Sequence, residues 1–122
     1  MKSLFLALGL LAFQQAPSNQ VLTQFPAVFH GEWAERLETC GTGDNDDRLI
    51  ISATEAQFYE ANGTLVSGVW CSNDVLRTTL SMTEHEEEWT STNNWVVADG
   101  GQTLVWEGED NSRQQWSRCP TP

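Results

Sequence analysis

The chain has 122 residues, with 17 acidic against six basic side chains and a formal net charge of −11 at pH 7. So acidic a surface repels nucleic-acid phosphates and anionic lipid headgroups, which disfavours both as partners, whereas a basic protein or a cation would be attracted. The length suffices for one domain with one hydrophobic core.

Residues 1–18 have the layout of a secretory signal peptide. Lys2 precedes the apolar run Leu4–Phe13, and a short polar stretch follows. The run is shorter than the ~20 apolar residues that a membrane-spanning helix needs. Small residues before the cut predict cleavage after Ser18. We therefore expect a secreted or periplasmic protein of residues 19–122, monomeric, not membrane-spanning and without lysine.

The expected mature chain consists of short strand-like stretches that recur about every ten residues, separated by Gly, Asn and Asp. Phe25–His30 precedes them and predicts a single 3₁₀ turn. Eight strands are predicted: Gly31–Leu37, Arg48–Ser52, Ala56–Glu60, Thr64–Ser72, Val75–Thr83, Glu87–Val97, Gln102–Glu107 and Ser112–Cys119.

Two local patterns support this interpretation. The clearest alternation lies in Val75–Thr83, where one face carries Leu76, Thr78, Leu80 and Met82. Between the third and fourth strands, Asn62-Gly63 predicts a tight hairpin turn, because Asn and Gly tolerate the positive φ angles that such a turn needs.

A meander of this kind exposes two sheet edges unless it closes on itself. Closure removes the edges, and eight strands enclose room for side chains or for one small ligand. The sequence therefore predicts an all-β fold, a small antiparallel up-and-down meander of about eight strands that forms a single closed barrel over residues 19–122. A flat sheet covered by a helix is less favoured, because no long helical pattern is present.

Three cysteines in an exported chain predict one disulfide and one free thiol. We favour Cys40–Cys119, because the first and last strands of a closed meander are neighbours; Cys40–Cys71 is the alternative. Cys71 is then expected to be a lone buried thiol, since it follows Trp70 in a strand-like run. No Cys-x-x-Cys pair supports a zinc knuckle or a thioredoxin-type site.

Two resemblances follow from these motifs. Gly31-Glu32-Trp33 resembles the opening of a lipocalin-like barrel, which implies that Trp33 plugs the closed barrel end. Most of the mature chain is similar to short uncharacterised secreted proteins of alphaproteobacteria, a likeness that implies no activity. The matching segments are Phe25–Trp33, Cys40, Leu49–Ser52, Phe58–Glu60 and Arg118-Cys119.

The candidate catalytic and metal motifs are incomplete. Asp44–Asp47 has the composition of a calcium loop, but Leu49 occupies the position that requires glycine. Glu84–Glu88 contains His85, yet Trp89 stands where a zinc peptidase needs its second histidine. No nucleophile elbow or catalytic triad is present. We therefore predict no enzymatic activity, no cofactor and no metal site, and keep a metal-dependent role for these carboxylates as a minor hypothesis.

The six tryptophans admit two interpretations. They can fill the core of a small barrel, or they can form a recognition surface. Trp70 and Trp116, both near polar residues, are the candidates for outward-facing binding residues. The resulting hypothesis is a non-enzymatic secreted or periplasmic binding protein, an inhibitor of a basic hydrolase such as a lysozyme or protease, or a carrier of a small apolar ligand. The alternative is a structural or stress-related envelope protein without a discrete ligand.

Overall fold

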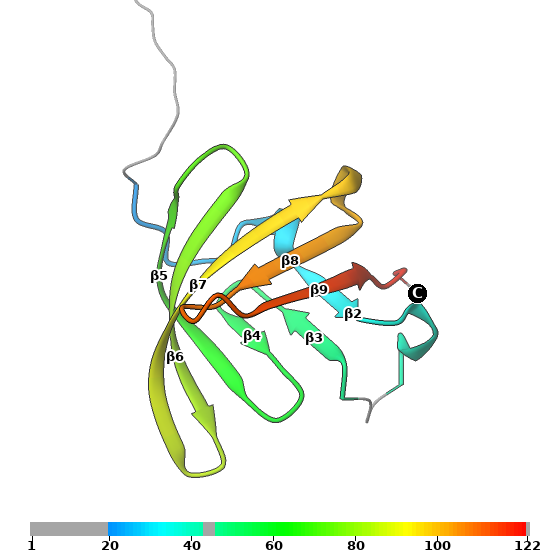
Figure 1. Cartoon of the computed structure of the whole chain (residues 1–122), viewed down its shortest axis with the longest axis horizontal. Helices are drawn as coiled ribbons and strands as arrows, with labels where there is room; N and C mark the ends of the chain where they lie inside the picture. Colours follow the sequence, from blue (N-terminus) through cyan, green and yellow to red (C-terminus); the bar gives the residue numbers. More distant parts are fainter. Residues whose placement is uncertain (1–19, 43–45, 122) are drawn as a thin grey trace, which may run out of the picture.

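The computed structural model describes residues 20–42 and 46–121. The predicted signal peptide and Asp44 lie outside these residues. The described chain forms one closed barrel of eight antiparallel strands (Figure 1), which confirms the predicted fold class. Its elements are η3 (Ala27–Phe29), β2 (Gly31–Ala34), η4 (Leu37–Thr39), β3 (Arg48–Ile51), β4 (Glu55–Gln57), β5 (Asn62–Trp70), β6 (Val75–Glu84), β7 (Glu87–Ala98), η5 (Asp99–Gly101), β8 (Thr103–Glu107) and β9 (Arg113–Arg118).

The strands pair in sequence order, and β9 returns to pair with β2. Trp33 lies opposite Arg118 and Ala34 opposite Ser117, and these two pairs close the barrel. Inward and outward side chains alternate along the strands, as the pleat requires. The predicted inner face of β6, Leu76, Thr78, Leu80 and Met82, is buried.

The predicted turn at Asn62-Gly63 is wrong. The chain turns earlier, where the Phe58 amide donates to the Ala61 carbonyl oxygen at 2.8 Å, and Asn62 already begins β5. Gly63 serves packing instead, because a Cβ there would lie 2.8 Å from Met82 Sδ. The glycine lets two paired strands approach closely inside the barrel.

The segment before β2 crosses one end of the barrel, which we call the covered end. Leu22 forms a β-bridge with Gly68, and the Phe25 amide donates to Ala53 O. Phe25 and Phe29 are 2% and 1% exposed and belong to the core. The opposite end, which we call the open end, is formed by the turns after β4, β6 and β8 and by the end of the β2–β3 connection.

Trp33 is fully buried beneath the covered end. Its Nε1 donates to the Phe29 carbonyl oxygen at 3.0 Å, and the Arg118 guanidinium lies 4.2 Å from the ring centroid. Arg118 also donates to the carbonyl oxygens of Val28, His30 and Gly101. Gly31 has φ +130°, and a Cβ would lie 3.1 Å from Arg118 Nη1. The glycine and tryptophan of the Gly-x-Trp motif thus each have a physical role here.

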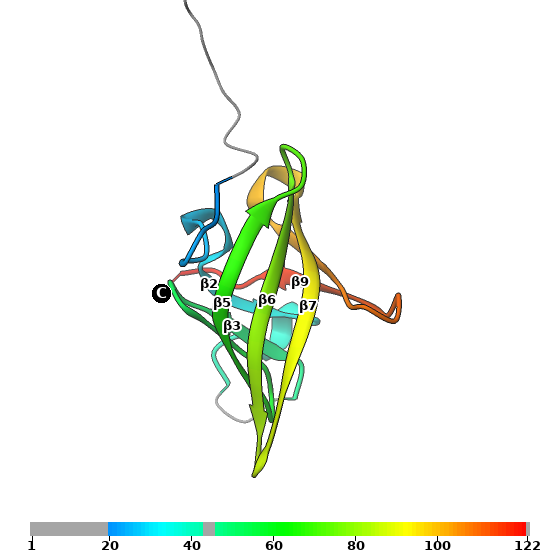
Figure 2. The ribbon, with the colours of Figure 1, turned by 90° about the vertical axis from the view of Figure 1, so that its left-hand side faces the viewer.

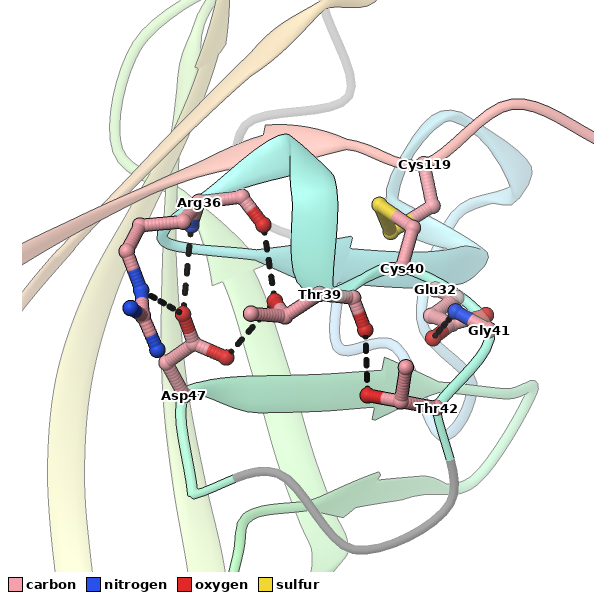
Figure 3. Close-up of a disulfide and its surroundings, with 8 residues drawn as sticks. All are labelled: Glu32, Arg36, Thr39, Cys40, Gly41, Thr42, Asp47 and Cys119. Atoms are coloured by element: carbon pink, nitrogen blue, oxygen red, sulfur yellow. Dashed lines mark hydrogen bonds and ion pairs between the residues drawn. A yellow bond between two sulfur atoms is a disulfide. The ribbon is translucent and has the colours of Figure 1, made fainter.

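The predicted Cys40–Cys119 disulfide is confirmed, with the two Cα atoms 5.6 Å apart. Figure 3 shows how it holds the β2–β3 connection against the end of β9. The prediction of a buried Cys71 is wrong, because this free cysteine is exposed. Strand β5 ends at Trp70, two residues before the predicted end at Ser72, so Cys71 belongs to the turn into β6, where its amide donates to Val75 O.

Candidate functional site

A pocket of about 250 Å³ lies at the open end of the barrel. It combines aromatic side chains from the interior with acidic side chains from the surrounding loops. Its lining residues are Glu35, Asp46, Asp47, Arg48, Phe58, Tyr59, Glu60, Ala61, Glu84, Gln114 and Trp116. These residues come from the β2–β3 connection, the start of β3, the β4–β5 turn, the end of β6 and strand β9.

Phe58 contributes to the floor of the pocket. The tight turn after β4 directs its ring into the barrel, whereas its neighbour Tyr59 is 55% exposed. The Phe58 ring centroid lies 6.3 Å from Trp95 and 6.5 Å from both Trp106 and Trp116. These distances are typical of favourable aromatic pairs. Four aromatic rings therefore occupy the part of the barrel interior where a lipocalin-like carrier would hold its ligand.

The rim of the pocket is predominantly anionic. Glu35, Asp46 and Glu60 are exposed carboxylates, and Arg48 is the one basic side chain among the lining residues. Gln114 donates to Glu35 Oε2 at 3.3 Å, which links the rim to strand β9. An aromatic surface beneath carboxylates attracts an ammonium or guanidinium group through both the ring quadrupole and the negative charges.

Asp47, the buried carboxylate of the rim, has a structural role (Figure 3). Its Oδ2 accepts hydrogen bonds from the backbone amide and Nε of Arg36, both at 3.2 Å, and its Oδ1 accepts one from Thr39 Oγ1 at 2.9 Å. Burial opposes its ionisation, but the hydrogen bonds from Thr39 and Arg36 and the charge of Arg36 lower its pKa. Asp47 therefore holds the β2–β3 connection in place beside the pocket.

The two predicted binding tryptophans are placed differently. The expectation that Trp116 points outward is wrong: it is 3% exposed, because the strand pleat turns it inward while its polar neighbours face out. It still lines the pocket, so its role in binding stays a prediction. Trp70 is half-buried and packs at the covered end, 5.9 Å from Phe29. The most exposed tryptophan is Trp89, at 41%, which our sequence reasoning did not select.

Three buried polar atoms in the described residues have no hydrogen-bond partner: Asn62 Oδ1, Asn93 Oδ1 and Trp106 Nε1. All three belong to strand positions toward the open end. Asn93 is 3% exposed, and its Nδ2 donates to Ser91 Oγ at 2.8 Å. No sequence pattern identifies such atoms, since their burial depends on how far the neighbouring strands extend.

No group of three or more His, Cys, Asp or Glu side chains in residues 20–42 and 46–121 is arranged to hold a metal ion. The sequence hypothesis of a metal role for Glu84–Glu88 and Asp46 thus gains no support, and Asp44 lies outside the described residues. Among the helices that the structure describes, none has the length and apolar character needed to cross a membrane.

Comparison of this chain with protein-family models, with curated proteins and with solved structures found no match. Any functional conclusion must therefore rest on the geometry and the charge of the molecule itself.

Proposed function

We propose that this chain is a non-enzymatic secreted or periplasmic binding protein whose open end receives a basic side chain of a partner protein. The observation that carries the proposal is the pocket in which Phe58 and Trp116 lie below a rim of carboxylates. A lysine or arginine that enters it would meet the aromatic rings as well as Glu60 and Glu84. Inhibition of a basic hydrolase, by occupation of the hydrolase surface, is the role that this geometry supports best.

The charge of the whole protein supports the same partner class. With 17 acidic residues and a net charge of −11, the protein attracts a basic partner over distances comparable with the Debye length. Such steering raises the association rate, and local contacts in the pocket then determine how long the complex lasts. The carrier hypothesis has less support, because Phe58 and its three tryptophan neighbours fill the interior near the open end.

Binding assays on residues 19–122 test this proposal. The immobilised protein is exposed to a basic lysozyme and a basic serine protease at about 50 and about 500 mM NaCl, with an acidic protein as negative control. Binding to at least one basic probe, weakened by salt, is expected. If neither basic probe binds, the proposal fails and the alternative of a structural envelope protein is favoured.

A matched pair of variants separates the pocket from overall charge. The double variant Glu60→Gln/Glu84→Gln removes two carboxylates of the pocket, and Glu38→Gln/Asp74→Asn removes two exposed carboxylates that line neither this pocket nor the surface beside β7. Both variants have the same net charge, so long-range steering is equal. We expect at least about tenfold weaker binding for the first and less than about twofold for the second. Equal loss in both would show that only net charge matters and would overturn the pocket.

A further inference from the structure

Strand β7 extends well beyond its neighbour β8. It pairs with β6 from Glu87, opposite Glu84, to Val96, opposite Val75. Its pairing with β8 covers Asn94–Ala98 alone. In the part of the chain that the structure describes, no strand lies beside Glu87–Asn93 on that side. Figure 2 shows this part of β7 as the margin of the layer formed by β5, β6 and β7.

The turn before β7 determines which backbone groups this edge offers. The turn has two central residues, His85 and Glu86, and His85 has a positive φ of 56°. In such a turn the Glu87 amide points toward Glu84 on β6. Because these directions alternate along an antiparallel strand, Glu88, Thr90 and Thr92 direct their N–H and C=O groups away from β6. The edge therefore presents three donor and acceptor pairs.

Glu87 and Glu88 are the charged side chains of the free edge, and its other protecting devices are absent. Proline, lysine and β-bulges commonly protect an edge, and none occurs in Glu87–Asn93. Its centre, Thr90-Ser91-Thr92, is uncharged, and Thr has a high β propensity. Trp89 adds an apolar side chain that is 41% exposed.

A second observation lies at the end of this edge. Asn93 lines a pocket of about 450 Å³ between β7 and the turn that follows β8, together with Arg77, Glu107 and Asn111. Thr92 and Asn94, whose side chains alternate along β7 with the inward-facing Asn93, line the same pocket. The edge therefore continues into a surface hollow that a side chain of an incoming chain can enter.

We propose that Glu87–Asn93 is a docking edge, onto which an extended segment of a basic partner protein adds as a further antiparallel or parallel strand. The inference rests on the proposed function, because it takes the partner to be basic, and it adds how that partner is held. Main-chain hydrogen bonds to Glu88, Thr90 and Thr92 would supply affinity, and side-chain contacts would supply specificity.

Charge distinguishes this occupant from a second copy of the chain. The hairpin beside the edge carries Glu84, Glu86, Glu87 and Glu88. Two copies paired edge to edge would bring their glutamates near one another, which is unfavourable. A segment with lysine or arginine at alternate positions would instead place positive charges beside these carboxylates. The structure therefore favours a basic partner over self-association.

The test uses one edge residue in two variants. Thr90→Pro removes the outward N–H at the centre of the edge, and proline is tolerated where the N–H faces solvent. Thr90→Val keeps that N–H and the side-chain shape, and serves as the matched control. The probe is a fluorescent heptapeptide of alternating lysine and valine, whose binding is measured by fluorescence anisotropy. A second probe has the same sequence but is N-methylated at alternate residues.

We expect wild type and Thr90→Val to bind the unmodified peptide equally, and Thr90→Pro to bind at least about tenfold more weakly, because the central hydrogen bond is lost. The N-methylated peptide should bind wild type weakly too, which tests the inference even if Thr90→Pro fails to fold. Equal binding by Thr90→Pro and wild type, or equal binding of both peptides, would overturn the docking edge.

Two further results separate this inference from the proposed function. If Thr90→Pro binds a basic hydrolase as tightly as wild type while Glu60→Gln/Glu84→Gln does not, the proposed pocket is supported and the docking edge is contradicted. If wild type binds neither the peptide nor the hydrolase, both proposals are contradicted. A wild-type dimer in sedimentation that becomes a monomer in Thr90→Pro would show that a second copy occupies the edge, and would overturn the basic partner.

Discussion

At the covered end of the barrel and in the centre of its core, the indole N–H groups of Trp33 and Trp95 are satisfied. Trp33 Nε1 donates to Phe29 O, and Trp95 Nε1, deeper in the core, donates to Thr78 Oγ1 at 2.8 Å. At the open end, Trp106 Nε1 is buried without a partner, and so is Asn93 Oδ1. An unpaired buried polar group destabilises the folded state by about 1–3 kcal/mol.

The two ends therefore differ in construction: the covered end closes the barrel, and the open end is the one to which we assign binding in our proposal. The covered end joins the first and last strands through Arg118, the disulfide and the buried rings. The open end has an exposed Trp89, a pocket with carboxylates and a strand edge without a neighbour. These features of the open end are the ones on which the proposed binding of a basic partner rests.

The largest expected effect comes from removing one tryptophan at each end. Trp33→Ala should lower the free energy of unfolding by about 3–5 kcal/mol, because it leaves a cavity and takes away the ring below Arg118. Trp89→Ala should change it by less than about 1 kcal/mol, since that side chain is 41% exposed. Urea unfolding followed by far-UV circular dichroism measures both. Similar losses would show that the two ends contribute alike to stability.

The disulfide gives the next largest effect. It joins residues separated by 79 positions, and its removal in Cys40→Ser/Cys119→Ser should destabilise the fold by about 2–5 kcal/mol. Cys71→Ser is the matched control and should change stability by less than about 0.5 kcal/mol, because Cys71 is exposed. Thermal unfolding of the three proteins compares them. Iodoacetamide should label Cys71 alone in the native protein, and labelling of Cys40 would contradict the assignment.

The architecture could be predicted because strand alternation and closure are local and topological properties. The alternating pattern in Val75–Thr83 identified the inner face of β6. Because the first and last strands of a closed barrel are adjacent, the Cys40–Cys119 pair could also be predicted. The exposure of residues at strand ends could not be predicted in the same way. Cys71 is exposed because β5 ends at Trp70, and a shift of one residue in the end of a strand changes whether such a residue is buried or exposed.

The candidate site depends on differences in strand length that periodicity does not encode. Trp116 was expected outside from its polar neighbours, yet the pleat of β9 turns it inward. Trp89 shares a face with the buried Trp95, but β7 extends beyond β8 at that point and leaves Trp89 exposed. Phe58 enters the barrel only because the chain turns at Phe58–Ala61 rather than at Asn62-Gly63. Each outcome depends on register and on where a neighbouring strand ends.

A smaller effect is expected from single polar groups in the core. Thr78→Val leaves Trp95 Nε1 without an acceptor and should destabilise the protein by about 1–3 kcal/mol. Asn93→Leu removes an acceptor that has no partner, together with the Nδ2 donor to Ser91 Oγ, and should destabilise by less than about 1 kcal/mol. Urea unfolding of both variants against wild type measures the contrast. A loss of more than about 2 kcal/mol for Asn93→Leu would show that Oδ1 already has a structural partner, such as bound water.

The smallest expected effect is the pH dependence contributed by Asp47. Burial raises its pKa, but the hydrogen bonds from Thr39 and Arg36 and the Arg36 charge outweigh burial, so the pKa in the folded protein lies below the ordinary value. A carboxylate with a lowered pKa stabilises the fold fully above the unfolded pKa of about 3.9, and this contribution is lost as the pH falls through the folded value. Stability of the wild type should therefore decline as the medium is acidified below about pH 5.

Asp47→Asn removes this titration and should reduce the decline, since the asparagine makes no ion pair with Arg36 at any pH. The pKa of Asp110 is also lowered, by hydrogen bonds from Ser112, but Asp110 is present in both proteins and does not affect their difference. Urea unfolding between about pH 7 and pH 3 measures the two curves. Parallel curves would show that Asp47 does not couple its charge to folding, and that the β2–β3 connection is held by the disulfide and by the hydrogen bonds that asparagine can also accept.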